Sequence, residues 1–382
     1  MSTMQGFNYR QFMQEYWQKK PCVIKGFIPN FVDPLDEHDL AGLAQESEVD
    51  SRLISQQGAN WQVTQGPIDD FEPLCKGAWI LLVQGVDKYI DEVNMLTDQV
   101  SDIPHWRLED VMVSFSNEGA GVGAHIDEYD VIIVQGKGRR RWQVGLPSHF
   151  NQLVTHPLLK QIDGFDAVID QELAPGDAIY IPPKHPHNGV ALTDCLNYSI
   201  GFRAPTDLEL LAGIVDESEA LAAKQTRYTD PDQLALRCAQ APASLVSNGE
   251  LQALTQMLQR LLESEAGQQT IVQYLSRQAL PELACDEEYT KRDTLSILTQ
   301  SAVLIRAPGV RPIFKEKASD TFTFYIDGGA FVAPQEIAVL TQAFISEEAT
   351  HLPLNLTKIQ MSLMADLCTE LLNAGYWYLE NA

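Results

Sequence analysis

The sequence is short of cysteine pairs, of long apolar runs and of positive charge. Its six cysteines lie far apart in 382 residues and form no Cys-x-x-Cys pair, so neither a zinc knuckle nor a dithiol redox motif is predicted. No apolar run reaches the roughly 18 residues of a membrane span, and no apolar run follows a basic N-terminal cap. We therefore expect no membrane segment and no signal peptide, and the isolated thiols fit the reducing cytoplasm.

The shortage of positive charge has consequences for partners. The chain carries 27 basic and 52 acidic residues, a formal net charge of −25. By our count the charge is −13 over residues 1–206, −5 over 207–280 and −7 over 281–382. Such a field repels nucleic acid and attracts basic proteins, so we expect a basic protein partner and no direct nucleic-acid binding. The alternative is that the acidity serves only solubility.

Three sections with different patterns divide the chain, as its length allows. Residues 1–206 begin with an amphipathic helix over 8–19, a strand over 21–27 and an acidic helical stretch over 33–50. Short β-branched runs punctuated by glycine and proline follow, at 79–84, 131–135, 140–144, 173–183 and 195–203. Several short strands with such turns predict a β-barrel of the cupin or jelly-roll kind.

The other two sections are expected to be mainly helical. Residues 207–280 repeat leucine every three or four positions, from Leu208 to Leu262, which predicts helices with an apolar stripe that build a homodimer. Residues 281–382 combine helices over 290–301, 334–344 and 358–373 with a hairpin over 321–333, and Gly375 is placed as a helix C-cap. This order suggests a winged-helix-like domain, but its acidic charge argues against DNA binding.

The chemistry centres on His125 and Asp127, which lie two residues apart. In an extended segment both side chains point to the same face. A second histidine from a distant strand would complete a facial triad of two histidines and one carboxylate, the signature of non-haem Fe(II) oxygenases. His185 and His187 are both candidates, because they share a face if their segment is extended.

Three segments carry a family resemblance. They are VSFSNEGAGVGAHIDEYDVIIVQGKGRRRW (113–142), ELAPGDAIYIPPKHPHNG (172–189) and NYSIGFRAP (197–205). Together they resemble the JmjC-type 2-oxoglutarate oxygenases and, within these, the bacterial ribosomal oxygenases that hydroxylate an arginine of large-subunit ribosomal protein sixteen. The resemblance implies a double-stranded β-helix fold and a reaction with Fe(II), 2-oxoglutarate and molecular oxygen. It also favours His187 as the distal metal ligand, which leaves His185 as a surface or rim residue.

The resemblance and the strand pattern nominate further site residues. Arg140 lies where similar hydroxylases carry the cation for the far carboxylate of 2-oxoglutarate, and its planar fork suits that role. Ser114 and Ser116 share a face and offer hydroxyls to the same carboxylate, and we select Ser114. Asn197 is expected to hydrogen-bond near the metal. Arg139 and Arg141 have the opposite parity and should point outwards.

The substrate side is predicted from what an arginine side chain needs, an acid and an aromatic wall. Asp110 shares strand parity with Ser114, and Tyr129 shares parity with His125 and Asp127, so both are placed at the barrel mouth. Competing interpretations are a lysine demethylase of the same chemistry, a small-molecule cupin enzyme and a non-catalytic acidic binding protein. The demethylase is disfavoured because no auxiliary zinc cysteines are present. The long extension beyond the barrel argues against a small-molecule enzyme, and the complete triad argues against a non-catalytic protein.

Overall fold

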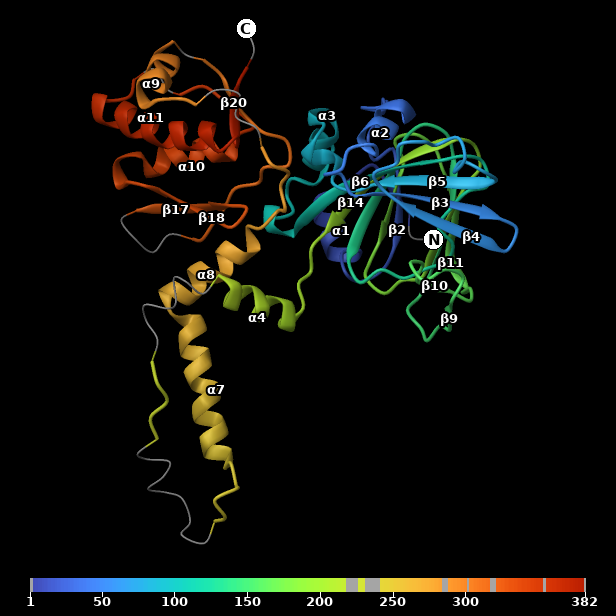
Figure 1. Cartoon of the computed structure of the whole chain (residues 1–382), viewed down its shortest axis with the longest axis horizontal. Helices are drawn as coiled ribbons and strands as arrows, with labels where there is room; N and C mark the ends of the chain where they lie inside the picture. The colour runs from blue at the N-terminus through green and yellow to red at the C-terminus, as the bar shows by residue number, and fades with distance from the viewer. Residues whose placement is uncertain are drawn as a thin grey trace.

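The computed structural model describes residues 3–217, 226–230, 241–283, 288–300, 302–316, 321–352 and 355–380. Within these ranges a barrel, a helical section and a C-terminal domain follow one another along the chain (Figure 1). Cys238 and Cys285 lie outside the described residues, and the four described cysteines are free thiols. Among the described residues, no helix has both the length and the apolarity needed to cross a membrane.

The barrel is built on a large, mostly antiparallel sheet. Its strands lie in the order β1-β2-β12-β7-β14-β6-β5-β3-β4. Their bounds are β1 Thr3–Gln5, β2 Cys22–Lys25, β12 Ala178–Ile181, β7 Asp130–Gln135, β14 Cys195–Phe202, β6 Leu108–Ser116, β5 Ala78–Val83, β3 Ser51–Gln57 and β4 Asn60–Gln65. The hairpin of β3 and β4 was not expected, because the strand-rich core was predicted to begin at residue 79.

A smaller sheet faces the large one. It contains β11 (Ala167–Leu173), β8 (Arg140–Gly145) and β13 (His187–Ala191) in that order, and a short hairpin of β9 (Gln152–Leu153) and β10 (Gln161–Ile162) lies beside it. Alternate residues of β7, β8, β11 and β12 meet in a buried cluster between the sheets, which includes Val131, Ile133, Trp142 and Val144. The opposite parity of β7, with Ile132 and Val134, packs into a second core on the outer face.

Helices and turns cover that outer face. The helix α1 (Tyr9–Glu15) is capped by Asn8 and buries Phe12 in the outer core, as its amphipathic pattern predicted. The helix α2 (Glu37–Leu43) has a capping box at Asp36 and is much shorter than the predicted stretch over 33–50. Between β5 and β6 the chain forms η1 (Val86–Lys88), α3 (Asp91–Asn94), η2 (Met95–Val100) and η3 (His105–Arg107).

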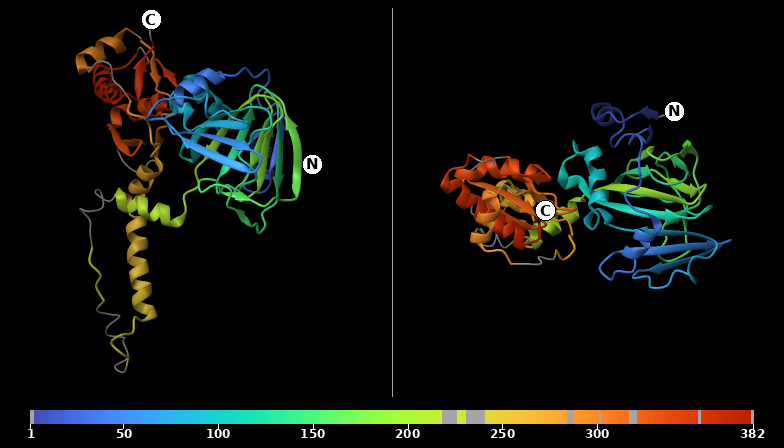
Figure 2. Two further views of the ribbon diagram at one scale, coloured as in Figure 1. Left: turned by 45° about the vertical axis from the view of Figure 1, so that its right-hand side comes forward. Right: turned by 90° about the horizontal axis from the view of Figure 1, so that it is seen from above.

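The helical section leads away from the barrel. It comprises α4 (Asp207–Asp216), α7 (Asn248–Glu263) and α8 (Glu265–Leu275). The helices α4 and α8 pack together through Ile214 and Ala266. By contrast α7 has no buried residue and extends as an arm away from the other described elements (Figures 1 and 2).

The C-terminal domain combines helices with two small sheets. Its elements are α9 (Lys291–Thr299), β15 (Leu304–Arg306), β16 (Ile313–Phe314), β17 (Phe322–Ile326), β18 (Gly329–Ala333), η4 (Gln335–Ile337), α10 (Ala338–Ser346), β19 (Ala349–Thr350), α11 (Lys358–Asn373) and β20 (Trp377–Leu379). The predicted hairpin and helices are present, and Gly375, with φ of +72°, follows the last turn of α11 as a C-terminal stop. Seen from above, the α3 region lies between this domain and the barrel (Figure 2).

Candidate metal and co-substrate site

Three side chains meet at one end of the space between the two sheets. The ligand-type atoms of His125, Asp127 and His187 all lie within 4.8 Å of one another. Asp127 Oδ2 is 3.7 Å from His125 Nε2 and 3.5 Å from His187 Nε2. His187 is buried, whereas the side chains of His125 and Asp127 are 22% and 26% exposed. The arrangement leaves one side open to solvent, as a facial triad requires.

The backbone sets this geometry across a gap of more than sixty residues. His125 and His187 form an isolated antiparallel bridge, and each backbone N–H donates to the other residue's carbonyl oxygen at 3.0 Å. His187 begins β13, whereas the segment around His125 is irregular apart from this bridge. The sequence prediction of a continuous extended segment at His125–Asp127 is therefore too simple, although the two side chains do converge.

Hydrogen bonds from the histidine rings prepare them as ligands. His125 Nδ1 lies 2.9 Å from the Gly123 carbonyl oxygen, and His187 Nδ1 lies 3.0 Å from that of His185. An Nδ1–H that donates to a carbonyl leaves the lone pair of Nε2 for a metal. Burial, and then the neighbouring His125, hold the pKa of His187 well below its usual value. The ring is therefore neutral near pH 7, which is the form that binds metals.

Arg140 is buried between the two sheets. Its Nη1 donates to Ser116 Oγ at 3.2 Å and to Asn197 Oδ1 at 3.1 Å, and its Nη2 donates to the Gly189 carbonyl oxygen at 3.1 Å. No carboxylate pairs with it among the described residues, and its Nε has no hydrogen-bond partner there. Desolvation lowers its pKa. A buried guanidinium with only neutral partners is a receptor for an anion.

The strand register explains the neighbours of Arg140. Ser114 is paired with Asn197, and Ser116 with Cys195, across β6 and β14. Asn197 Nδ2 donates in turn to Gln135 Oε1 at 2.9 Å. Ser114 is buried on the same face, but the bond to Arg140 comes from its neighbour Ser116.

Sequence reasoning missed Gln135 and Gly189. Gln135 has the same parity as the inward-facing Val131 and Ile133, so alternation alone would have found it. Gly189 permits close packing, because a Cβ there would lie 2.7 Å from Arg140 Nε and 2.8 Å from the Trp142 ring. Trp142 also lies under the guanidinium, 5.0 Å from ring centroid to Cζ.

The two residues proposed for the substrate lie in β6 and directly before β7. Asp110 is partly buried and accepts a hydrogen bond from the Gly85 backbone N–H at 2.8 Å. Burial, and then the charge of Asp87, raise the pKa of Asp110 to about 6. Tyr129 is 46% exposed, and its pKa is raised by burial and then by the charges of Asp127 and Asp110. Asp127 and Asp110 thus both act on the phenol, and the substrate role of Asp110 and Tyr129 stays a prediction.

Three further residues had a predicted exposure to solvent. Arg139 and Arg141 are exposed, as expected, and pair with Glu172 and Asp170 on the neighbouring strand. His185, expected at the surface or rim, is instead only 7% exposed, with Nδ1 3.0 Å from the Pro183 carbonyl oxygen. That prediction was wrong because the segment turns at Pro182–Pro186 and packs against the barrel rather than running straight along its edge.

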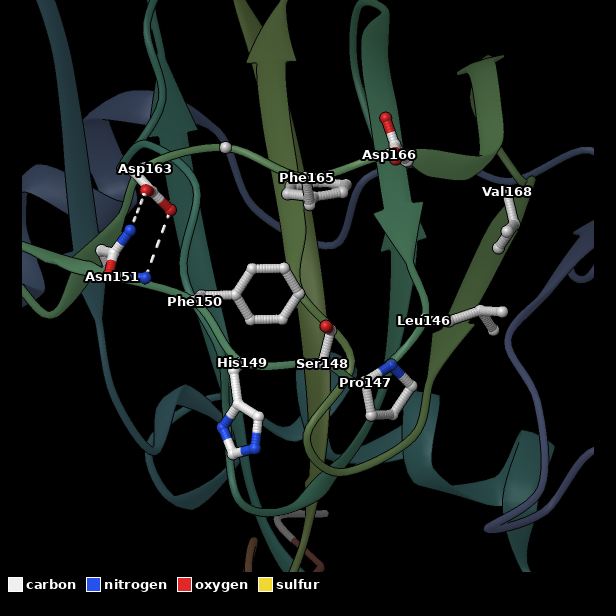
Figure 3. A pocket seen from close by; sticks show the side chains of 11 residues that line it. Leu146, Pro147, Ser148, His149, Phe150, Asn151, Asp163, Phe165, Asp166 and Val168 are labelled. Atoms are coloured by element: carbon white, nitrogen blue, oxygen red, sulfur yellow. Dashed lines mark hydrogen bonds between the residues drawn. The ribbon is translucent and has the colours of Figure 1, made fainter.

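A separate hollow of about 640 Å³ opens beside β8 (Figure 3). It is lined by the segments 146–151 and 163–168, and no triad residue lines it. Asn151 and Asp163 close one end through hydrogen bonds, with Nδ2 to Oδ2 at 2.6 Å (Figure 3). It adjoins the site, since Gly145 N–H donates to the carbonyl oxygen of Pro186. We assign it no part in the chemistry.

Comparison with known proteins agrees with this geometry. A JmjC domain model matches residues 95–210, and a ROXA-like winged helix model matches residues 260–378. Over 376 residues, 98% of both chains, the protein is 37% identical to the ribosomal protein uL16 3-hydroxylase of Escherichia coli. The chain belongs to the JmjC ribosomal oxygenases. It is also 33% identical over 312 residues to a probable ribosomal oxygenase of Haemophilus influenzae, covering 77% of this chain and 75% of that one.

Solved structures of ribosomal oxygenases share the whole architecture. A ribosomal oxygenase of E. coli in complex with cobalt and 2-oxoglutarate matches with a TM-score of 0.86 and 35% identity, over 98% of this chain and 99% of that one. A structure of the same enzyme with cobalt and succinic acid matches with a TM-score of 0.83 and 35% identity. The ribosomal oxygenase fold, a cupin barrel followed by helices and a winged helix, is thereby confirmed for this chain.

Proposed function

We propose that this ribosomal oxygenase hydroxylates an arginine of ribosomal protein uL16 with Fe(II), 2-oxoglutarate and molecular oxygen. One C–H bond of the arginine side chain becomes C–OH, and 2-oxoglutarate is oxidised to succinate and carbon dioxide. One oxygen atom of O₂ enters the arginine, and the other enters succinate. The observation that carries the proposal is a His-Asp-His cluster in the same barrel as a buried arginine that has no acidic partner among the described residues.

The residues of the site fit both a divalent metal ion and 2-oxoglutarate. His125, Asp127 and His187 offer two imidazoles and one carboxylate to a divalent metal, and iron bound there with 2-oxoglutarate supplies the oxidising chemistry. Arg140 offers two nitrogens to the far carboxylate of the co-substrate, supported by Ser114 and Asn197. A structural relative binds cobalt and 2-oxoglutarate, which supports the same pair of ligands here.

Charge and the rim residues support an arginine as the target. The net charge of −25 accelerates encounter with a basic protein and discourages nucleic acid. Asp110 supplies a carboxylate and Tyr129 a partly exposed ring, which together suit a guanidinium. Because exposed charges are screened beyond about 8 Å at physiological ionic strength, association should weaken as salt is added.

The test is direct. The purified enzyme, loaded with iron, is incubated with free uL16 and 2-oxoglutarate, and the protein is digested and analysed by mass spectrometry. We expect a gain of one oxygen, about 16 Da, on one arginine, and the same mark should disappear from ribosomes of a deletion strain. Succinate release without a modified arginine in any ribosomal protein would leave an oxygenase with another substrate, and loss of a methyl group instead would indicate demethylation.

The section 207–280 is proposed to build a homodimer. Leu251, Leu254 and Leu258 on the projecting helix α7 are 51%, 41% and 60% exposed, and Leu208 of α4 is 73% exposed. A stripe of leucines left in water at this spacing favours a second helical surface as its cover. Light scattering at micromolar concentration should give twice the chain mass of 42.6 kDa. A monomer under those conditions would exclude the proposal.

A further inference from the structure

The turn after β5 joins the rim of the barrel to the C-terminal domain. Gly85 begins the turn, and η1 continues it through Asp87 and Lys88. Lys88 Nζ donates to the carbonyl oxygens of Gln278 and Ala279, and Gly309 packs so closely on Lys88 that a Cβ there would lie 2.8 Å from its Cγ. The turn is thus in direct contact with the end of the helical section and with the C-terminal domain.

Asp87 and Arg311 form a buried ion pair at the centre of this junction. Arg311 Nη2 lies 2.5 Å from Asp87 Oδ2, and the two residues are 4% and 0% exposed. The Arg311 backbone is held in place by Gln278, whose side-chain oxygen accepts from Arg311 N–H at 3.0 Å and whose side-chain nitrogen donates to the Arg311 carbonyl. Among the described residues, Arg311 is the cation that faces the Asp87 carboxylate.

Asp87 is also hydrogen-bonded to β6, the strand that carries Asp110. Asp87 Oδ1 accepts from the Val111 backbone N–H at 2.7 Å, while Asp110 Oδ2 accepts from the Gly85 backbone N–H at 2.8 Å. Where the backbone pairing of β5 with β6 ends, these two side-chain carboxylates thus take over the hydrogen bonding between the segments. The β6–β14 register shifts at the same place, between the pairs Ile200–Val111 and Phe202–Leu108. Bulges of this kind re-aim side chains beside active sites.

The two hydrogen bonds join two acids to the same pair of segments. Burial, and then the charge of Asp87, raise the pKa of Asp110, while Lys88 and the bond from Gly85 act in the opposite direction. The charge of Asp110 in turn helps to raise the pKa of Tyr129, on which Asp127 and Arg52 also act. The charged groups that act on Asp110 are therefore Asp87, Lys88 and Glu109, with Arg311 behind Asp87, and Tyr129 is the titratable group on which Asp110 acts.

We propose that Arg311, in the C-terminal domain, is a positioning residue for catalysis, which acts through Asp87 to keep Asp110 in place and ionised for the substrate guanidinium. The proposal rests on the proposed function, because it takes Asp110 as the acid that receives the arginine. By neutralising Asp87, Arg311 limits the repulsion between the two carboxylates. The winged helix thereby becomes part of the substrate site without touching the substrate.

The experiment uses the full-length protein, four variants of the ion pair and one control variant. Arg311→Met removes the charge and keeps the aliphatic stem, and Arg311→Lys keeps the charge. Asp87→Asn removes the repelling carboxylate, and the double variant Asp87→Asn/Arg311→Met removes both charges. Arg306→Met is the matched control, because Arg306 is a buried arginine of the same domain whose ionic partner, Glu348, also lies in that domain.

Two quantities are measured over pH 5 to 8 in each protein. The first is the ionisation midpoint of Asp110, from ¹³C-carboxyl NMR spectra assigned by comparison with Asp110→Asn. The second is the Michaelis constant for a uL16 fragment containing the target arginine, with the maximal rate recorded separately. The NMR midpoint needs no substrate, so it tests the Arg311 proposal even if uL16 is not the substrate.

The two single variants that remove a charge, Arg311→Met and Asp87→Asn, should move the Asp110 midpoint in opposite directions. From a starting point of about 6, Arg311→Met should raise it by about one unit, which increases the Michaelis constant about fivefold near pH 6 and hardly at all near pH 8. Asp87→Asn and the double variant should both lower the midpoint. Arg311→Lys and Arg306→Met should leave it near the wild-type value.

A merely structural role predicts a different result. In that case Arg311→Met and Arg306→Met lower the melting temperature and the maximal rate alike, and neither moves the Asp110 midpoint. Midpoints that stay fixed, or that move in the same direction in Arg311→Met and Asp87→Asn, would overturn the proposal. If the midpoints move as expected while the wild type leaves uL16 unmodified, the positioning by Arg311 stands and the substrate assignment fails.

Discussion

Arg140 and Arg311 are both almost fully buried, at 3% and 4% exposure, yet their surroundings differ completely. Arg140, inside the barrel, donates to a serine hydroxyl, an amide oxygen and a backbone carbonyl, and faces no carboxylate among the described residues. Arg311, between the barrel and the C-terminal domain, is paired at 2.5 Å with the buried carboxylate of Asp87. The first guanidinium lacks an anion and the second already has one.

The difference separates a binding site from a structural junction. Burying a cation without a counter-ion is costly, so a fold that does it gains when an anionic ligand arrives. A buried ion pair leaves no unpaired charge for a ligand to bind, but removing either partner leaves the other charge buried and unpaired. The four predictions below test this contrast, starting with the largest expected effect.

Asp127→Ala should abolish 2-oxoglutarate turnover while the protein stays folded. The substitution removes the one carboxylate of the triad, which is 26% exposed and contributes little to the core. Without it the metal loses a charged ligand and the co-substrate loses its anchor. Succinate release and bound metal are measured together with the melting temperature. Glu128→Ala is the control, because the Glu128 side chain is 77% exposed and its ion pair with Lys184 is long, at 3.9 Å. Full activity of Asp127→Ala would remove the triad assignment.

Arg311→Met and Arg140→Met should differ sharply in folding stability. Arg311→Met leaves Asp87 buried without its cation and should lose about 3–5 kcal/mol in the free energy of unfolding. Arg140→Met removes a desolvated charge together with neutral hydrogen bonds, so its stability should stay within about 1 kcal/mol of the wild type. Denaturant unfolding without 2-oxoglutarate measures both. Equal losses would mean that Arg140 already has a counter-ion in the ligand-free protein.

The two arginines should also differ in their effect on the affinity for 2-oxoglutarate. Arg140→Met should lose a charge-assisted pair with the far carboxylate, about 2–4 kcal/mol or roughly thirty- to a thousandfold in affinity. Arg311→Met should leave that affinity unchanged, because Arg311 pairs with Asp87 and shares no hydrogen-bond partner with Arg140. Calorimetric titration of the metal-loaded proteins makes the comparison. An unchanged value for Arg140→Met would move the carboxylate-binding role to another cation.

The contrast also shows how far the sequence could be interpreted. Alternation put Ser114 and Ser116 on one face of their strand and pointed Arg139 and Arg141 outwards, because a sheet face is set by a period of two. Arg140 was nominated from the family resemblance, and Asn197 from its place on the final strand. It missed the β3–β4 hairpin, whose run SRLISQQGANWQVTQ contains four glutamines and shows weak alternation. Local pattern works where one face of a strand is uniformly apolar, and fails at polar edges.

The junction lay beyond local pattern altogether. Asp87 and Arg311 are 224 positions apart in the sequence, and nothing in the residues around either indicates the other. Their pairing follows from how two domains pack, which depends on many contacts at once, such as those of Gln278 and Lys88. The triad was found because its chemistry restricts residue type, whereas an ion pair accepts any acid and any base.

The smallest expected effect separates the two serines of β6. Ser116 accepts from Arg140, whereas no hydrogen bond of the Ser114 hydroxyl is present among the described residues, which leaves that hydroxyl for the co-substrate. Ser114→Ala and Ser116→Ala should each weaken 2-oxoglutarate binding by about 1 kcal/mol, roughly fivefold. A double-mutant cycle with Arg140→Met distinguishes the reasons. The effect of Ser116→Ala should vanish in the Arg140→Met background, because Ser116 acts by holding the guanidinium, while that of Ser114→Ala should persist. If Ser114→Ala has no effect and Ser116→Ala keeps its full effect without Arg140, then Ser116 binds the carboxylate itself and the selection of Ser114 from the sequence was wrong.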